Sequence, residues 1–393
     1  GTRPAHGVGG PMARTAVVAL VVVLAAACGT DSGDSRTTVV QTTTATASAA
    51  ASDVWRTSTP EEQGASSNVL TGLFLEVADR DYAIDTATVI RNGHLIAHAA
   101  RDNYQDGELH VVHSVTKSII STLIGLAIDE GYLDSVDQRV LDVFGDRVAA
   151  NNDERKEQMT IEDLLTMTSG FDCRDSYLYE WEGLDDLRHS DDWVQHILDL
   201  PMIATPGEEF EYCNRASFLL SAIVQEATGQ TAKQYAVDGL FGPIGVSEID
   251  WPANPDGISI GWGSLRMAPL DLARFGLLIL GEGRWQGGQV VPAQWIDRAT
   301  RPYVHGTLQD GYGYQWWIRV DGTGQGLGYE GQYLIIDREL NMVTVFTSKL
   351  PDEEFYLPDD LYDRYVLSSV KADEPLPPAP EAFEAMQAAI NRW

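Results

Sequence analysis

The chain has 393 residues, of which 44% are hydrophobic and ten are tryptophan, so it can build one large domain or two interleaved lobes. Its formal net charge of −31 argues against a nucleic-acid partner, because phosphate binding requires a basic stripe. Acidity of this kind otherwise indicates no more than solubility.

The N-terminal region predicts export. Residues 1–11 are expected to lie upstream of the protein proper, which would begin at Met12. A basic start and thirteen largely apolar residues, 15–27, suit a signal peptide and are too short for a bilayer span of about 20 residues. The run ends in Ala-Ala-Ala-Cys28, which resembles the lipobox of bacterial lipoproteins, although Ala25 stands where leucine is commonest. The resemblance implies that Cys28 is lipidated and becomes the mature N-terminus. The alternative is a plain secretory signal cleaved nearby.

Residues 29–53 form a segment of Thr, Ser and Ala without periodicity. Such a segment cannot bury enough apolar surface to order itself, and we interpret it as a flexible tether. A lipid anchor followed by a tether predicts a monomeric cell-surface or periplasmic lipoprotein whose catalytic domain covers residues 54–393. The lipid would be its only contact with the membrane.

The remaining cysteines predict a disulfide. Once Cys28 is set aside, Cys173 and Cys213 are an even pair in an exported chain, where oxidation is expected. The alternative is a pair of buried free thiols. No histidine or cysteine spacing resembles a zinc site and no Gly-rich phosphate loop is present, so we expect neither a metal nor a cofactor.

The predicted elements before residue 114 are a helix and a hairpin. The apolar periodicity of residues 68–78 predicts an amphipathic helix. The runs 86–90 and 94–99 alternate apolar and polar residues around Asn92-Gly93, which is a strong signal for a tight hairpin.

The later elements predict an α+β fold. Residues 135–250 are mainly helical, and further helices are expected at 270–281, near 354–368 and after a Pro-rich break at 375–380. Strand-like runs occupy 314–320, 332–337 and 342–348. The simplest assembly is one antiparallel sheet made from both ends of the domain, flanked by helices, with the helical lobe inserted between them.

The most informative motif is Ser114-Val-Thr-Lys117 at the start of the apolar segment 118–128. Residues three apart share a helix face, so the hydroxyl and the amine would be neighbours. A helix that is apolar nearly all round is normally buried, and burial disfavours the charged form of Lys117. Its neutral amine can then activate Ser114 as a nucleophile, while the helix N-terminus favours a developing oxyanion. The helix would lie at the junction of the two lobes, where ligand clefts commonly form.

Three rival signals are weaker. A second Ser-x-x-Lys, Ser368 to Lys371, lies in a polar chain end without a buried helix behind it. Gly257-Ile-Ser259-Ile-Gly261 matches the nucleophile elbow of α/β-hydrolases, but its flanks predict loop where the elbow needs a strand and a helix. His113 precedes Ser114, yet adjacent helix residues point about 100° apart, which favours a capping or surface role.

Two downstream segments can complete a site. Tyr212-Cys-Asn214 precedes a helix, and its phenol and amide can move a proton and orient a partner. Taken alone, it is more typical of an ordinary turn. The glycines of segment 326–332 can let a strand present a backbone N–H to a substrate carbonyl, or can simply form a hairpin turn.

Ser-x-x-Lys, Tyr-x-Asn and a glycine-containing strand, in this order, resemble the serine β-lactamase and penicillin-binding superfamily. Within it, the chain is most similar to class C β-lactamase-like esterases and amidases of the 6-aminohexanoate-dimer hydrolase type. The resemblance covers roughly residues 55–350 and includes the segments 164–170, 200–207, 265–276, 311–317 and 331–333.

The resemblance implies a β-lactamase/transpeptidase-like fold and a role for each matching residue. Ser114 would be the acyl-accepting nucleophile, Lys117 its proton acceptor, and Tyr212 a second acid/base. Asn214 would orient Lys117 and the substrate. The segment Gly331-Gln332 would bind substrate, with the N–H groups of Ser114 and Gln332 as the oxyanion hole.

One departure bears on the substrate. Where the family's β-lactamases and peptidases carry Lys-Thr-Gly, this chain has Tyr329-Glu330-Gly331. The missing cation removes a usual partner of a substrate carboxylate. We therefore predict a secreted serine hydrolase of a small ester, amide or peptide-like substrate. The alternatives are a D-Ala-D-Ala carboxypeptidase or β-lactamase, or an inactive cell-envelope binding protein.

Overall fold

A seven-stranded antiparallel sheet is the centre of the fold in the computed structural model, which describes residues 55–101, 104, 107–173 and 184–393. The strand order is β2-β1-β12-β11-β10-β9-β8. The first strands therefore pair with the last, as the sequence predicts for a sheet built from both ends of the domain. The strands are β1 (Ile84–Arg91), β2 (His94–Ala100), β8 (Gly311–Tyr312), β9 (Trp317–Ile318), β10 (Gly324–Gly328), β11 (Gln332–Asp337) and β12 (Met342–Ser348).

The predicted hairpin joins β1 and β2. Asn92 and Gly93 both have positive φ, 51° and 73°, which is the backbone that a two-residue turn between twisted strands requires. Strands β1, β11 and β12 are buried along their whole length, so both faces of the central sheet are covered.

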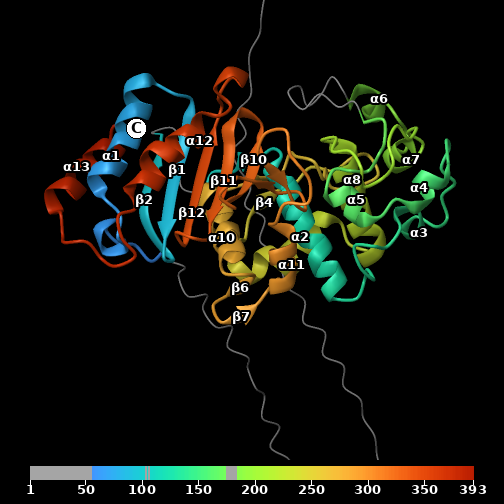
Figure 1. The fold of residues 1–393 in the computed structure, drawn as a ribbon, viewed down its shortest axis with the longest axis horizontal. Helices are drawn as coiled ribbons and strands as arrows, with labels where there is room; N and C mark the ends of the chain where they lie inside the picture. The colour runs from blue at the N-terminus through green and yellow to red at the C-terminus, as the bar shows by residue number, and fades with distance from the viewer. Residues whose placement is uncertain (1–54, 102–103, 105–106, 174–183) are drawn as a thin grey trace, which may run out of the picture. The chain divides into compact units, whose positions relative to one another are not determined.

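Helices cover the two faces of the sheet (Figure 1). On one face, Gly276 lies close to the side chains of Leu334, Ile336 and Val343. On the other face, the hydroxyl of Tyr333 donates to the carbonyl of Phe355 at 3.0 Å. The first face carries α2 (Val115–Asp129) and α10 (Pro269–Leu280), with α11 (Ala293–Ala299) packed against α2. The second face carries α12 (Leu357–Leu361) with the π-helical turn η7 (Tyr362–Leu367); α1 (Ser67–Arg80) packs against η7, and α13 (Pro380–Ile390) packs against α1 and β2.

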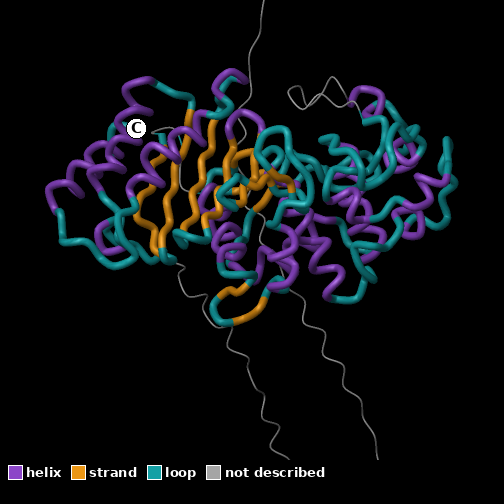
Figure 2. Tube along the Cα trace, viewed as in Figure 1, coloured by secondary structure: helices purple, strands orange, loops and turns teal. Residues whose placement is uncertain are grey.

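A helical lobe is inserted between α2 and the last strands (Figure 2). Its central helix is α8 (Asn214–Thr228), which packs against α2 and ends at Gly229 with a positive φ of 72°. Around it lie α3 (Val140–Val143), α4 (Glu154–Gln158), α5 (Ile161–Leu165), α6 (Asp185–Arg188), α7 (Trp193–Leu198), α9 (Ala232–Ala236) and the short turns η3 (Val237–Phe241) and η4 (Gly242–Ile244).

Two small sheets complete the fold. The first has the order β3-β5-β4 and contains β3 (His110–Val111), β4 (Ile249–Asp250) and β5 (Arg266–Met267). The second is the hairpin of β6 (Arg284–Trp285) and β7 (Gly288–Gln289). Within the described part of the chain, every helix is too short or too polar to cross a bilayer.

The predicted strand at 314–320 is wrong in its first half. Gln315 has a φ of 61° and forms a turn, so only Trp317–Ile318 is extended as β9. The buried Gln315 side chain donates to the carbonyls of Leu164 and Leu165 and accepts from Ser217, which are contacts with the helical lobe that a strand would not allow.

Candidate active site

Ser114 lies at the N-terminal end of α2, where it occupies the N-cap position. Its neighbour His113 has a φ of 45°, so the chain turns sharply into the helix. All residues from Val115 to Ala127 are buried, in agreement with the apolar pattern. The hydroxyl of Ser114 is therefore held by a rigid buried helix, near the partial positive charge of its N-terminus.

The Lys117 amine lies among three hydrogen-bond acceptors. Its Nζ donates to Ser114 Oγ at 2.9 Å, to Asn214 Oδ1 at 2.8 Å and to the Trp262 carbonyl at 2.7 Å. The Lys117 side chain is only 1% exposed. The structure thus brings three of the predicted site residues, Ser114, Lys117 and Asn214, into one hydrogen-bonded group.

Tyr212 lies beside this group. Its ring centroid is 4.7 Å from Lys117 Nζ, and the ring stacks on Trp317 with centroids 5.5 Å apart. Tyr312 packs edge-on against both rings, and burial raises the pKa of Tyr312 well above its usual value. The phenol of Tyr312 therefore stays neutral beside the site.

A cavity of about 270 Å³ opens onto Ser114. Tyr212 and Asn214 line it from the helical lobe, so the predicted residues of both lobes meet at one cavity. The other lining residues come from the sheet and its connections: Leu308, Trp317, Leu327, Gly328, Tyr329, Asp352, Phe355 and Tyr356. The sequence points to Leu327, Gly328 and Tyr329 through the glycine-rich segment 326–332, and Trp317 lies in a segment that carries the family resemblance. It gives no signal for Leu308, Asp352, Phe355 and Tyr356.

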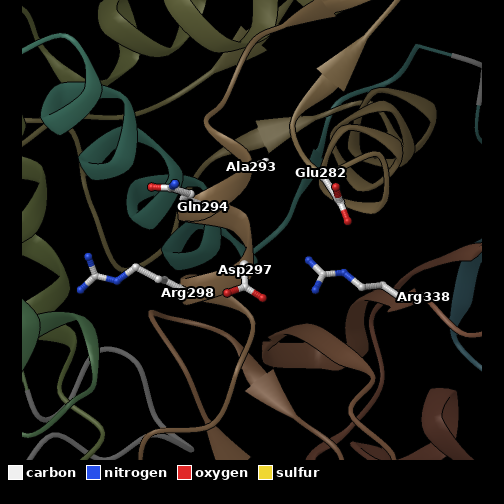
Figure 3. A pocket seen from close by; sticks show the side chains of 6 residues that line it. All are labelled: Glu282, Ala293, Gln294, Asp297, Arg298 and Arg338. Carbon is white, nitrogen blue, oxygen red and sulfur yellow. The ribbon is translucent and has the colours of Figure 1, made fainter.

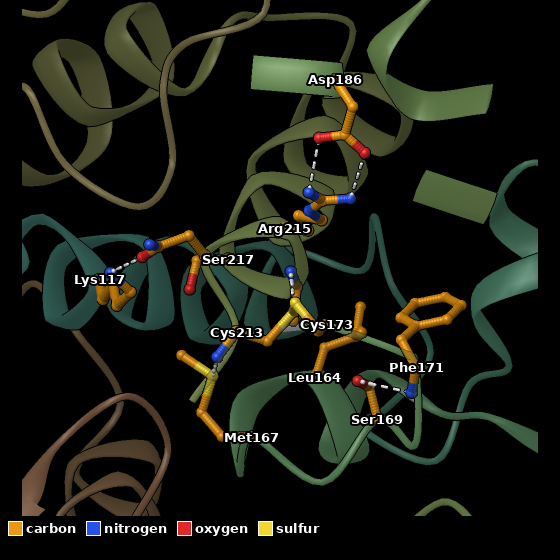
Figure 4. Close-up of a disulfide and its surroundings, with 12 residues drawn as sticks. Lys117, Leu164, Met167, Ser169, Phe171, Cys173, Asp186, Cys213, Arg215 and Ser217 are labelled. Carbon is orange, nitrogen blue, oxygen red and sulfur yellow. Dashed lines mark hydrogen bonds and ion pairs between the residues drawn. A yellow bond between two sulfur atoms is a disulfide. The ribbon is translucent and has the colours of Figure 1, made fainter. Parts of the chain in front are cut away.

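The predicted disulfide between Cys173 and Cys213 is confirmed (Figure 4). It holds the loop in which Cys213 lies between Tyr212 and Asn214. Cys213 is bonded to Cys173, and its sulfur also accepts the N–H of Ala216 in the first turn of α8. The N–H of Cys213 in turn donates to the sulfur of Met167 at 3.2 Å.

Neighbouring contacts hold the same loop. The N–H of Glu211 donates to the carbonyl of Met167 at 2.8 Å. Beyond the disulfide, the buried Arg215 makes an ion pair with Asp186 of α6 at 2.8 Å. The covalent bond and these contacts together brace the Tyr-Cys-Asn loop against the helical lobe.

The segment 257–261, which matches the nucleophile-elbow motif of α/β-hydrolases, has a structural role instead. Ser259 is 1% exposed, and its Oγ accepts the N–H of Lys233 within a loop. A Cβ on Gly261 would lie 2.2 Å from the carbonyl oxygen of Ser217, so only glycine lets this loop approach α8. That approach delivers the Trp262 carbonyl to Lys117, a contact that the sequence does not predict.

Strand β10 passes close to the nucleophile. A Cβ on Gly328 would lie 2.6 Å from the Val112 carbonyl and 3.1 Å from Cβ of His113, so glycine is required for this approach. The segment Leu327 to Tyr329 consequently lines the cavity next to Ser114.

Gly331 and Gln332, which the sequence assigns to substrate binding, lie further along the hairpin. They are not among the lining residues. A Cβ on Gly331 would meet Ser348 and Leu350, and the Gln332 amide pairs with the backbone of Ser348. The geometry therefore favours Leu327 to Tyr329 over Gln332 as the source of a backbone donor.

Glu330, at the tip of the same hairpin, faces the residue before the nucleophile. Its carboxylate lies 3.6 Å from His113 Nε2. The polar contact with the His113 ring lowers the pKa of the Glu330 carboxyl. Glu330 does not line the cavity, so its charge acts on the hairpin more than on a bound substrate.

A second cavity, of about 470 Å³, lies at α11 and away from these residues (Figure 3). It is lined by Glu282, Ala293, Gln294, Asp297, Arg298 and Arg338 and contains no nucleophile. In the described ranges, no three His, Cys, Asp or Glu side chains are grouped so that they could hold a metal ion.

Known proteins resemble the chain in sequence and fold. It is 23% identical over 304 residues to the 6-aminohexanoate-dimer hydrolase of Paenarthrobacter ureafaciens, covering 71% of this chain and 76% of the relative. EstCE1, a hydrolase with promiscuous acyltransferase activity, superimposes with a TM-score of 0.64 at 16% identity over 76% of this chain and 99% of its own. A penicillin-binding protein from Bacillus halodurans superimposes with a TM-score of 0.59 at 20% identity over 74% and 99%.

These likenesses agree with a family assignment that spans most of the sequence. The model of the Beta-lactamase family matches residues 42–367. The chain therefore belongs to the Beta-lactamase family and is a serine hydrolase of the β-lactamase and penicillin-binding type.

Proposed function

We propose that the protein hydrolyses a small ester or amide through an acyl-enzyme on Ser114. The observation that carries this proposal is the 2.9 Å contact between Ser114 Oγ and a lysine amine that is almost wholly buried. In the reacting state, neutral Lys117 takes the proton of Ser114 as its oxygen attacks the substrate carbonyl carbon. The resulting oxyanion is stabilised by the N–H of Ser114 and a backbone N–H of the Leu327–Tyr329 segment.

Tyr212 completes the proton path. As the tetrahedral intermediate collapses, the bond from the carbonyl carbon to the leaving group breaks, and the Tyr212 hydroxyl protonates that group. The proton on Lys117 restores the phenol. Water then attacks the acyl carbonyl carbon and gives a proton to the Tyr212 oxygen, while the phenolic proton of Tyr212 passes to neutral Lys117. When the bond between the carbonyl carbon and Ser114 Oγ breaks, Lys117 returns this proton to Ser114, which releases the acid and regenerates the site.

The cavity favours an ester or amide over a β-lactam or a D-Ala-D-Ala peptide. Its described lining is mainly aromatic and aliphatic and contains no lysine or arginine that could bind a substrate carboxylate. The names of two similar proteins, a 6-aminohexanoate-dimer hydrolase and EstCE1, a hydrolase with promiscuous acyltransferase activity, agree with hydrolysis through acyl transfer.

The test is hydrolysis of p-nitrophenyl acetate and butyrate by the purified domain. Ser114→Ala should lower kcat/KM on the order of 10³-fold or more, because the nucleophile is lost. Ser368→Ala is the matched control, because it alters the other Ser-x-x-Lys motif, and it should retain full activity. A wild-type protein that turns over none of the esters, short amides or nitrocefin would favour the inactive binding protein. Fast nitrocefin turnover with slow ester cleavage would favour a β-lactamase.

We also propose that the protein is exported as a monomeric lipoprotein held by Cys28. The support is the layout of residues 12–28 and the tether-like composition of residues 29–53. Expressed from Met12 in a bacterial host, the wild type should fractionate with membranes, and Cys28→Ala should move it to the soluble exported fraction. Equal membrane association of both forms would contradict the proposal.

A further inference from the structure

The cavity at Ser114 carries one charge in its described lining. Of the described lining residues, only Asp352 has a carboxylate and none is lysine or arginine, while the remainder of the wall is aromatic, aliphatic or polar. Asp352 begins the short helix η6 (Asp352–Glu354), which follows the end of β12 at Ser348 after a connection of three residues. It is half-buried, so its charge is partly removed from water.

Two basic residues that are close in sequence to lining residues, Lys349 and Arg319, are engaged elsewhere. Lys349, three residues before Asp352, contacts the Tyr104 hydroxyl and lies 3.6 Å from Asp85. Arg319 makes ion pairs with Asp359 of α12 at 2.7 Å and with Asp363 of η7 at 2.8 Å. In the described part of the chain, no ion pair links either of them to Asp352, and the carboxylate presents its negative charge to the cavity.

Aromatic rings surround the same space. Trp317, Tyr329, Phe355 and Tyr356 all line the cavity, and the rings of Phe355 and Tyr356 meet edge to face with centroids 5.2 Å apart. The negative face of an aromatic ring attracts an ammonium group, more strongly when water is excluded.

The wall that carries Asp352 is held in place. The Tyr333 hydroxyl donates to the Phe355 carbonyl at 3.0 Å, which fixes the turn between η6 and α12. At the start of α12, the Asp359 carboxylate accepts from Arg319, Gln325 and Gln309. A carboxylate and rings that are already positioned bind a cation without a further ordering cost.

We propose that the substrate of this site carries an ammonium group, bound by Asp352 and the neighbouring rings while its ester or amide carbonyl lies at Ser114. This inference rests on the proposed hydrolase function and names its substrate class. The formal charge of −31 acts in the same direction, because a negative field raises the local concentration of cations. A substrate carboxylate in place of the ammonium group would be repelled by Asp352, and no lysine or arginine in the described lining would balance its charge.

The experiment compares ester pairs that differ in charge and match in shape. On the acyl side, p-nitrophenyl 4-(trimethylammonio)butyrate is compared with p-nitrophenyl 5,5-dimethylhexanoate. On the leaving-group side, butyrylthiocholine is compared with 3,3-dimethylbutyl thiobutyrate. The wild type should prefer the cationic member of at least one pair by about 10-fold in kcat/KM, mainly through KM. The preference should weaken as NaCl is raised.

The variant Asp352→Asn keeps the shape of the wall and removes its charge. It should reduce the ratio of cationic to neutral kcat/KM by about 10-fold. Glu353→Gln removes one negative charge from the adjacent exposed residue and should leave that ratio unchanged. Equal ratios in wild type and Asp352→Asn, or no cation preference in either pair, would overturn this inference while leaving the hydrolase intact. Absence of turnover of all four esters would contradict the hydrolase itself.

Discussion

The arrangement around Lys117 explains how a single amine can serve as a base. A neutral amine has two N–H donors and one lone pair. Asn214 Oδ1 and the Trp262 carbonyl are acceptors only at these atoms, so they take the two N–H groups. The lone pair is then left for the Ser114 hydroxyl. Because Trp262 contributes its backbone carbonyl and not its side chain, no sequence motif predicts this contact.

The His113–Glu330 pair supports the first residue-level prediction. Glu330→Gln should lower kcat/KM for esters by roughly 3- to 10-fold, because the pair holds the β10–β11 hairpin against the residue before Ser114. Glu339→Gln, an exposed change at the other end of β11, should have no effect. An equal loss in both variants would show that the pair does not position the hairpin.

The same pair has a defined pH dependence. Contact with His113 lowers the pKa of Glu330 below the usual value of a glutamate carboxyl. A carboxyl whose pKa is lower in the folded protein stabilises the fold fully above the unfolded value and loses that effect as pH falls through the folded value. The difference in Tm between wild type and Glu330→Gln should therefore be largest near pH 5–7 and should shrink below about pH 4.5.

At the scale of elements, two short connections join the lobes at the site. The turn at Gln315 links α2, α5 and α8, because its backbone carbonyl accepts from Ser118 and its side-chain amide bonds Ser217 and Leu165. The loop at Cys213 links α8 to the segment that ends at Cys173. Tyr212 comes directly before Cys213, and Trp317 lies two residues after Gln315. The rings of Tyr212 and Trp317 stack on each other in the cavity wall.

The disulfide supports an element-level prediction. Cys173→Ala combined with Cys213→Ser removes the covalent link, while the serine oxygen can still cap α8 by accepting from Ala216. The free energy of unfolding should fall by about 2–4 kcal/mol, since a link between residues 40 apart constrains the unfolded chain. Replacing Cys213 by alanine instead should cost about 1 kcal/mol more through loss of the cap. Urea unfolding measures both steps, and identical stabilities of the two double variants would refute the capping role.

Sequence reasoning finds elements whose signal is local. The Asn92-Gly93 turn is predictable because two positive φ angles need those residue types, and α2 is predictable because it is apolar on every side. The turn at Gln315 is missed because its aromatic flanks look like a strand and the reason for turning lies in contacts with α5 and α8. The cavity wall at Phe355 and Tyr356 is missed for a similar reason, because only tertiary packing brings it to Ser114.

For the whole molecule, the meeting of the early and late strands of the described domain in one sheet is the organising feature. Strand β1 pairs with β12, and the segment near Gly64 lies beside Ala372. A Cβ on Gly64 would lie 2.0 Å from the Ala372 carbonyl oxygen, so this approach needs a glycine. The nucleophile helix and the cavity wall at Asp352 come from opposite halves of the sequence, and this closure sets their relative position.

Arg91 is the residue that joins these parts, and it supports the prediction for the whole molecule. Its side chain is 1% exposed and donates to the carbonyls of Gln63 at 2.5 Å, Leu340 at 3.2 Å and Ala372 at 2.9 Å. Arg91→Met fills the same space but leaves buried carbonyls without donors, which should cost about 2–4 kcal/mol of unfolding free energy. Arg91→Lys can restore part of these bonds and should cost less. Arg338→Met, an exposed change, is the control and should be nearly neutral. Closure of the domain ends also positions Asp352 relative to Ser114. Arg91→Met should therefore lower ester turnover at temperatures where the variant is still folded. Unchanged stability and turnover would show that Arg91 does not hold the domain ends together.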